Sequence, residues 1–127
     1  MSEKDSRDQA VLIVEDADDA RYFMRLELEQ LGYRVVEAEN GLRAVEVAER
    51  ERPDIILMDL SLPIMDGIAA TEKIRATDGL DEVPIIALTA YQETDFREEA
   101  KAAGFDGYLT KPIDLDWLGE LLKGLLA

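Results

Sequence analysis

Five short apolar runs at regular spacing constrain the fold of this chain more than any other feature. The first covers Val11 to Val14, and further strand candidates begin near Arg34, Ile55, Pro84 and Gly107, about 21 to 29 residues apart. A continuous apolar run of this length is typical of a strand buried on both faces of a parallel sheet. The spacing leaves room for a helix that returns the chain to the same end of the sheet.

The segments between these runs have apolar residues at the three- and four-residue steps of a helix that packs through one face. Gly32 is expected to end the first helix, and another helix is predicted from about Gly67 to Thr77. The Asn40-Gly41 pair could mark a hairpin, but the Ala- and Glu-rich segment after it favours a strand-to-helix loop. The side chains predicted to face the sheet are Ala20, Phe23, Met24, Leu28 and Leu31; Leu42, Val45 and Ala48; Phe96 and Ala100; and Leu115, Leu118, Leu122 and Leu125, with Leu121 at the edge.

Strands that alternate with helices predict an α/β fold, a (βα)5 doubly wound parallel sheet with helices on both faces. The 127 residues are the usual size of one domain. Residues 1–10 are polar and lack periodicity, so we expect a flexible N-terminal leader followed by one domain over residues 11–127.

Composition narrows the chemistry that this domain can perform. The chain has no histidine and no cysteine, which excludes imidazole bases, thiol nucleophiles and thiolate metal sites. Its 29 acidic and 14 basic residues give a formal net charge of −15, which disfavours direct binding to nucleic acid or to an anionic membrane. No run approaches the roughly 18 apolar residues of a membrane span, and the N-terminus lacks the apolar part of a signal peptide, so a cytoplasmic location is expected.

Polar residues stand at the carboxyl ends of four of the five predicted strands. They are Glu15 and Asp16 after the first strand, Asp59 at the third, Thr89 at the fourth and Lys111 at the fifth. In open parallel sheets the functional cleft lies outside the carboxyl ends of the strands. We therefore expect these side chains to converge although they are far apart in the sequence.

Three converging carboxylates should not gather without a cation or a proton. Two like charges about 4 Å apart repel by about 4 kcal/mol at an effective dielectric constant of about 20. Mg²⁺, with Mn²⁺ as an alternative, suits a site made only of oxygen ligands. Lys111 could then meet one phosphate oxygen and the hydroxyl of Thr89 another, so the pattern predicts a site for a phosphoryl group.

Each of these residues, taken alone, has a simpler interpretation. Glu15 and Asp16 could cap the next helix, and Asp59 could be a turn residue at a strand end. Thr89 is of a β-favouring type, and a lysine such as Lys111 is usually solvated. The combination at successive strand ends is what favours a functional site.

The segments VLIVED, LMDLSLPIMDG, ALTA and GYLTKP, in this order and spacing, resemble the response regulator receiver family, the CheY-like group that includes the chemotaxis switch protein. The similarity extends over about residues 11 to 125. It implies a flavodoxin-like three-layer fold with strand order 2-1-3-4-5. It also implies a receiver domain that serves a two-component phosphorelay.

The resemblance assigns roles at the acidic end of the site. It makes Asp59 the phosphoacceptor, and it makes Glu15, Asp16, Asp59 and the main-chain carbonyl of Ser61 the metal ligands. Glu15 stands where Asp is also common, and its longer side chain is expected to act through a water, so Asp16 is the more direct ligand. Ser61 and Tyr91 lie where the family tunes the access of water to the phosphoryl group.

The resemblance also implies how the phosphoryl group is bound and sensed. Thr89, the backbone of Ala90 and Lys111 would bind phosphoryl oxygens. Thr89 and Tyr108 would form the switch, and Lys111-Pro112 is expected to be a cis peptide.

The function implied is transfer of a phosphoryl group from a kinase phosphohistidine to Asp59, with slow self-catalysed reversal rather than enzymatic turnover. Protein contacts would change on the face made by the fourth helix, the fifth strand and the fifth helix, which would bind a downstream protein. One alternative is a receiver domain from a larger regulator or hybrid kinase. Another is an aspartyl-phosphate phosphohydrolase, although such enzymes usually carry a second aspartate where this chain has Ser61. A flavin-binding module is disfavoured because the first loop is acidic rather than rich in glycine and hydroxyls.

Overall fold

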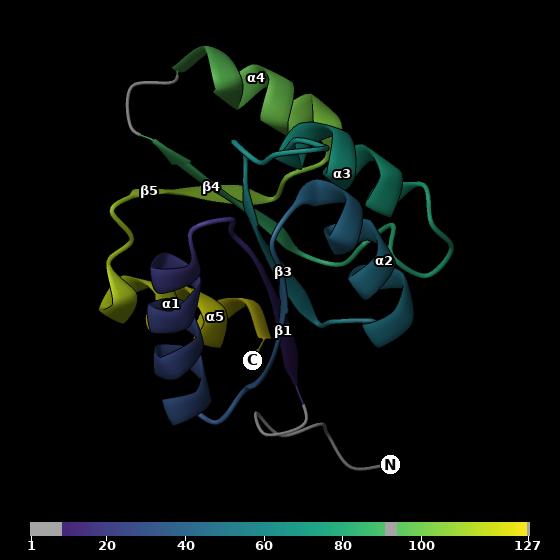
Figure 1. Cartoon of the computed structure of the whole chain (residues 1–127). Helices are drawn as coiled ribbons and strands as arrows, with labels where there is room; N and C mark the ends of the chain where they lie inside the picture. The colour runs from purple at the N-terminus through teal and green to yellow at the C-terminus, as the bar shows by residue number, and fades with distance from the viewer. Residues whose placement is uncertain (1–8, 91–93, 127) are drawn as a thin grey trace.

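Figure 1 shows the computed structural model of the chain, which describes residues 9–90 and 94–126, without the side chains of residues 94–97 and 99. The strands are β1 (Ala10–Val14), β2 (Arg34–Ala38), β3 (Ile55–Asp59), β4 (Ile85–Ala90) and β5 (Gly107–Lys111). The helices are α1 (Asp18–Gln30), α2 (Gly41–Glu51), α3 (Gly67–Arg75), α4 (Thr94–Ala103) and α5 (Leu115–Leu126). Strands and helices alternate along the chain, as the sequence predicts.

The five strands form one parallel sheet in the order β2-β1-β3-β4-β5. Helices α1 and α5 cover one face of the sheet, and α2, α3 and α4 cover the other (Figure 1). The predicted three-layer flavodoxin-like fold and its strand order are therefore confirmed.

The central strands divide their side chains between two cores. In β1, Leu12 and Val14 pack toward α2 and α3, whereas Val11 and Ile13 pack toward α1 and α5. All four side chains are fully buried, because each face of a parallel sheet is covered by helices. This two-sided burial is the reason that the strands appear in the sequence as continuous apolar runs.

The polar residues at two helix starts act as caps. The side chain of Asn40 accepts a hydrogen bond from the Arg43 amide at 2.8 Å and begins α2. The side chain of Asp66 accepts a hydrogen bond from the Ala69 amide at 2.8 Å and caps the start of α3. The Asn40-Gly41 pair is thus a helix start, as expected, and not a hairpin.

Two predicted helix faces need correction. Phe23 is 57% exposed, since α1 packs through Met24 and Leu28, and the Phe23 ring contacts Tyr22 edge-on instead. Leu42 is also exposed. A Cβ atom at Gly41 would lie 1.9 Å from the Met65 carbonyl oxygen, so α2 approaches this loop through Gly41, and Leu42, one residue on, points outward.

Smaller differences lie at the two ends of the domain. Leu125 is exposed, because the buried stripe of α5 continues from Leu122 to Leu126. Ala10, expected in the leader, is fully buried as the first residue of β1. Gln9, also expected in the leader, is partly buried, and its side chain donates to the Leu126 carbonyl at 3.0 Å. Residues 1–8 lie outside the described residues, as does the side chain of Phe96. Ala100 is buried as expected.

Within the described part of the chain, the helices are too short or too polar to cross a bilayer.

Candidate functional site

The carboxyl ends of the parallel strands lie at one edge of the sheet (Figure 1). Glu15 directly follows β1, and its amide donates to the Ala38 carbonyl at 3.1 Å, which extends the pairing with β2. Asp59 and Lys111 are the last residues of β3 and β5. Because the strands are parallel, these ends lie at the same edge of the sheet, with β1 beside β3 and with β4 between β3 and β5.

Three carboxylates form the centre of the site. One oxygen each from Glu15, Asp16 and Asp59 lies within 4.8 Å of the others. Glu15 and Asp59 are only 2% and 3% exposed, whereas Asp16 is exposed. Carboxylates so close together repel one another unless a positive charge or a proton lies between them.

Lys111 supplies part of that charge. Its Nζ atom lies 2.5 Å from Oδ2 of Asp59 and 3.0 Å from Oε1 of Glu15. Burial alone would lower the pKa of Lys111, but the hydrogen bonds and negative charges of Asp59 and Glu15 outweigh it and raise the pKa above its ordinary value. Lys111 is therefore held in its charged form between the two buried carboxylates.

Backbone amides fix the two buried carboxylates from the other side. The amide of Ser61 donates to Oδ1 of Asp59 at 2.9 Å, and the amide of Ala17 donates to Oε2 of Glu15 at 3.1 Å. Both oxygens of Glu15 thus already accept hydrogen bonds. The same is true of Asp59, whose Oδ2 atom accepts from Lys111, so both buried carboxylates are held on two sides.

Gly67 supports the site in a way that sequence reasoning missed. A Cβ atom at Gly67 would lie 2.2 Å from the Asp59 carbonyl oxygen, and the Gly67 amide donates to the Leu60 carbonyl at 3.1 Å. The Asp66-Gly67 pair indicates only a helix start in the sequence. Asp66 stands only seven residues after Asp59, the last residue of β3. This short spacing was the available signal that the chain must turn back closely over Asp59.

Most of the remaining predicted residues belong to β4, to β5 or to the residue that follows β5. Thr89 is partly buried on β4, and its hydroxyl donates to the Ala90 carbonyl at 3.2 Å. Tyr108 is 45% exposed on β5 and lies opposite Ala87 in the strand register. The Lys111-Pro112 bond is cis, as expected. Tyr91 lies outside the described residues.

The donor set fits a hard divalent cation. All side-chain donors at the cluster are carboxylate oxygens, and Mg²⁺ is typically bound by one or two carboxylates and several waters. The exposure of Asp16 leaves one side of the cluster open to solvent, where such waters would lie. The cluster can therefore hold a metal ion beside Asp59.

Comparison with known proteins agrees with this geometry. The family model for the response regulator receiver domain matches residues 11–123. The polar-differentiation response regulator DivK of Brucella anthropi is 35% identical over 119 residues, 94% of this chain and 97% of its own. Sporulation initiation phosphotransferase F of Bacillus subtilis is 33% identical over 118 residues, 93% of this chain and 94% of its own.

Solved structures show the same likeness. The receiver domain of a sensor histidine kinase from Pseudomonas aeruginosa, with a magnesium ion coordinated in its active-site cleft, is 42% identical with a TM-score of 0.86. That match covers 93% of this chain and 97% of the other. Chemotaxis protein CheY4 of Vibrio cholerae is 30% identical with a TM-score of 0.88, covering 93% and 98% of the two chains.

The chain belongs to the response regulator receiver domain family. It is a phosphoacceptor domain of two-component signalling, a class that interacts with histidine kinases and downstream targets.

Proposed function

We propose that Asp59 is the residue that accepts the phosphoryl group from a histidine kinase or a phosphotransfer protein. The observation that supports this most directly is the environment of its carboxylate, which is 3% exposed and is held between the Lys111 ammonium and the Ser61 amide. Glu15, Asp16, Asp59 and the main-chain carbonyl of Ser61 would hold Mg²⁺, or alternatively Mn²⁺. When bound, the metal ion neutralises negative charge on the transferring phosphoryl oxygens.

The transfer requires no general base. An oxygen of the ionised Asp59 carboxylate forms a bond to phosphorus, and the bond from phosphorus to the kinase imidazole nitrogen breaks with its electron pair on nitrogen. Lys111, already charged, can follow a phosphoryl oxygen as the charge on Asp59 is reduced. Thr89 and the backbone amide of Ala90, at the end of the neighbouring strand, would donate to the other oxygens.

The output would follow from these new hydrogen bonds. Movement of Thr89 toward the phosphoryl group vacates space on β4, into which the half-exposed Tyr108 ring can rotate. We infer that this reshapes the surface made by α4, β5 and α5, where a downstream protein binds. A few charge-assisted hydrogen bonds suffice for the few kcal/mol that such a population shift needs.

We infer that the domain is a stoichiometric phosphoacceptor in the cytoplasm rather than a turnover enzyme. The residue two positions after Asp59 is Ser61, which provides a hydroxyl and no second carboxylate for the repeated hydrolysis of a phosphate ester. Water would release the phosphoryl group slowly and reset the domain.

The test is incubation with acetyl phosphate and Mg²⁺, followed by intact mass. We expect one added phosphoryl group that is lost in alkali and is absent when EDTA replaces Mg²⁺. Asp59→Asn should remove the label, and the exposed Asp116→Asn should keep it as a matched control. Labelling of Asp59→Asn, or many turnovers of a phosphate ester per chain, would contradict the proposal.

A further inference from the structure

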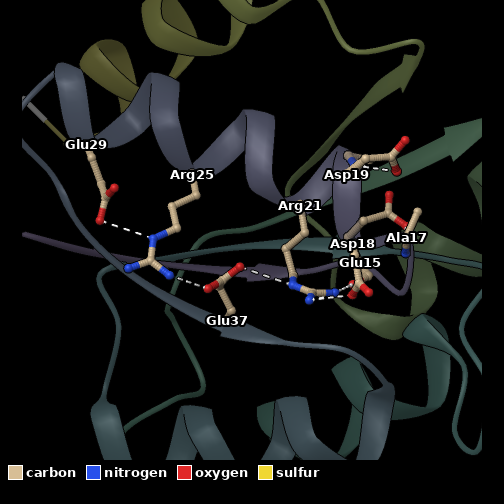
Figure 2. Close-up of polar contacts among 9 residues, drawn as sticks. Glu15, Ala17, Asp18, Asp19, Arg21, Arg25, Glu29 and Glu37 are labelled. Atoms are coloured by element: carbon tan, nitrogen blue, oxygen red, sulfur yellow. Dashed lines mark hydrogen bonds and ion pairs between the residues drawn. The ribbon is translucent and has the colours of Figure 1, made fainter.

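Arg21 connects the acidic site to two other parts of the fold (Figure 2). Its Nη1 atom donates to the main-chain carbonyl of Glu15 at 2.8 Å. Its Nε atom donates to Glu37 on β2 at 3.1 Å, and its Nη2 atom donates to Asp18 at the start of α1 at 2.7 Å. The side chain is 17% exposed, so one mostly buried guanidinium fastens the β1–α1 loop, β2 and α1 together.

The contact with Glu15 fixes the backbone from which two of the acids project. The Glu15 amide is held by the Ala38 carbonyl at 3.1 Å, and the Glu15 carbonyl is held by Arg21. That carbonyl and the Asp16 nitrogen belong to one planar peptide unit. Once its orientation is set, the direction in which the exposed Asp16 leaves the loop is restricted as well.

We propose that Arg21 is a positioning residue for the metal site, and that its guanidinium holds the Glu15–Asp16 peptide in the orientation that aims both carboxylates at Mg²⁺. This inference rests on the proposed metal role of the acidic cluster. Arg21 acts through the loop and not by contact with the ion. Preorganisation of ligands in this way strengthens metal binding, since less order must be imposed when the ion enters.

Simple electrostatics predicts the opposite effect, which makes the role testable. A positive guanidinium near a cation site repels the cation, so removal of the charge alone would tighten Mg²⁺ binding. Loss of the positioning contact would weaken it. The sign of the change in affinity therefore separates the two explanations.

Arg25 provides a matched control on the same helix. It also donates to Glu37, with Nη1 2.6 Å from Oε2, but its Nε atom donates to Glu29 rather than to the site loop (Figure 2). It lies about 6 Å further along the helix axis. Arg25→Gln therefore removes one positive charge and one tie between α1 and β2, and leaves the Glu15 carbonyl bonded to Arg21.

The experiment compares the full chain with Arg21→Gln, Arg21→Lys and Arg25→Gln by calorimetric titration with Mg²⁺, with thermal unfolding to identify the folded variants. We expect the Kd for Mg²⁺ to rise about tenfold in Arg21→Gln and to stay within about twofold in Arg25→Gln. Arg21→Lys keeps the charge but cannot span the three acceptors with a planar fork, so its Kd should also rise. This variant carries the test if Arg21→Gln does not fold.

Unchanged or tighter binding in folded Arg21→Gln, wild-type affinity in Arg21→Lys, or an equal loss in Arg25→Gln would overturn the positioning role. Each of these outcomes would leave the proposed phosphoacceptor function intact. Failure of the unaltered chain to bind Mg²⁺ would overturn the metal proposal as well, so the two failures are distinguishable.

Discussion

The Nζ atom of Lys111 lies 2.5 Å from Oδ2 of Asp59, although 52 residues separate them in the chain. The same atom lies 3.0 Å from Oε1 of Glu15, so one ammonium serves two buried carboxylates from two other strand ends. In the resting domain Lys111 is the counter-ion of the acidic cluster. In the proposed transfer it would follow charge from Asp59 to a phosphoryl oxygen.

Lys111→Gln should therefore separate metal binding from phosphoryl transfer. We expect Mg²⁺ to bind at least as tightly, because one positive charge has left the site. The initial rate of labelling by acetyl phosphate should fall about 100-fold, as is typical when a donor to a developing negative charge is removed. A time course of intact mass measures the rate, and Lys123→Gln on the exposed side of α5 is the control. Labelling of Lys111→Gln at the unaltered rate would refute a role in transfer.

Gly67→Ala should damage both the fold and the site. The new Cβ atom would lie 2.2 Å from the carbonyl oxygen of Asp59 and 3.0 Å from the α-carbon of Leu60, and backbone atoms cannot move aside cheaply. We expect the free energy of unfolding in urea to fall by at least about 2 kcal/mol, as in overpacked cores. Slower labelling by acetyl phosphate should accompany the loss, because relief of the clash displaces Asp59.

Gly124→Ala is the matched control for that prediction. Gly124 lies in α5, and a Cβ atom there would meet nothing within 4 Å. The same substitution should leave labelling unchanged and stabilise the chain by up to about 1 kcal/mol through helix propensity. Equal effects at the two glycines would show that the close approach over Asp59 is unimportant.

The sequence predicts the sheet and the composition of the site for one physical reason. Strands buried on both faces must be continuously apolar, so the polar residues that end them are conspicuous, and parallel topology places those ends together. Asp59 and Lys111 could be placed in one site on this basis, before any distance was known.

The features that sequence reasoning missed depend on contacts between distant segments. Leu42 is exposed because Gly41 must approach the carbonyl of Met65, and no local pattern reports that approach. The guanidinium of Arg21 reaches the carbonyl of Glu15 only once α1 is packed, and an arginine at that helical position looks like an ordinary solvated side chain. The rotation of a helix about its axis and the contacts of a long side chain are set by tertiary packing. The periodicity of apolar residues does not predict them.

Arg75→Gln should destabilise the fold without affecting the site. The guanidinium of Arg75 is 17% exposed and donates to the carbonyls of Leu80, Val83 and Gly104 and to the carboxylate of Asp106. These acceptors lie just before β4 and β5, at the amino-terminal ends of the strands, whereas Asp59 lies at a carboxyl end. We expect a loss of about 2–4 kcal/mol in urea unfolding, because several acceptors lose a charged donor. The Kd for Mg²⁺ should stay unchanged.

Arg50→Gln provides the comparison for Arg75. Its ion pair with Glu51 is at the surface, with the Arg50 side chain 59% exposed, and such pairs contribute about 0–1 kcal/mol. We expect the free energy of unfolding of Arg50→Gln to fall by less than about 1 kcal/mol. If both variants lost the same small amount of unfolding free energy, the contacts of Arg75 with three carbonyls would not contribute substantially to stability.

The raised pKa of Lys111 predicts how its contribution to stability depends on pH. Its pKa in the folded chain lies above the ordinary value of 10.5, so the folded state holds this proton more tightly than the unfolded state does. The stabilisation is therefore fully present below pH 10.5 and is lost as the pH rises through the folded-state pKa. Burial also raises the pKa of Tyr33 above 10.0, which adds a loss of stability in the same alkaline range.

A comparison of the unaltered chain with Lys111→Gln removes the Tyr33 contribution, which both chains share. With Mg²⁺ absent, we expect the difference between their free energies of unfolding in urea to be constant from about pH 6 to pH 9 and to shrink only above about pH 10.5. A difference that already declined between about pH 6 and pH 9 would mean that the Lys111 ammonium loses its proton near neutrality, contrary to a cation stabilised by two buried carboxylates.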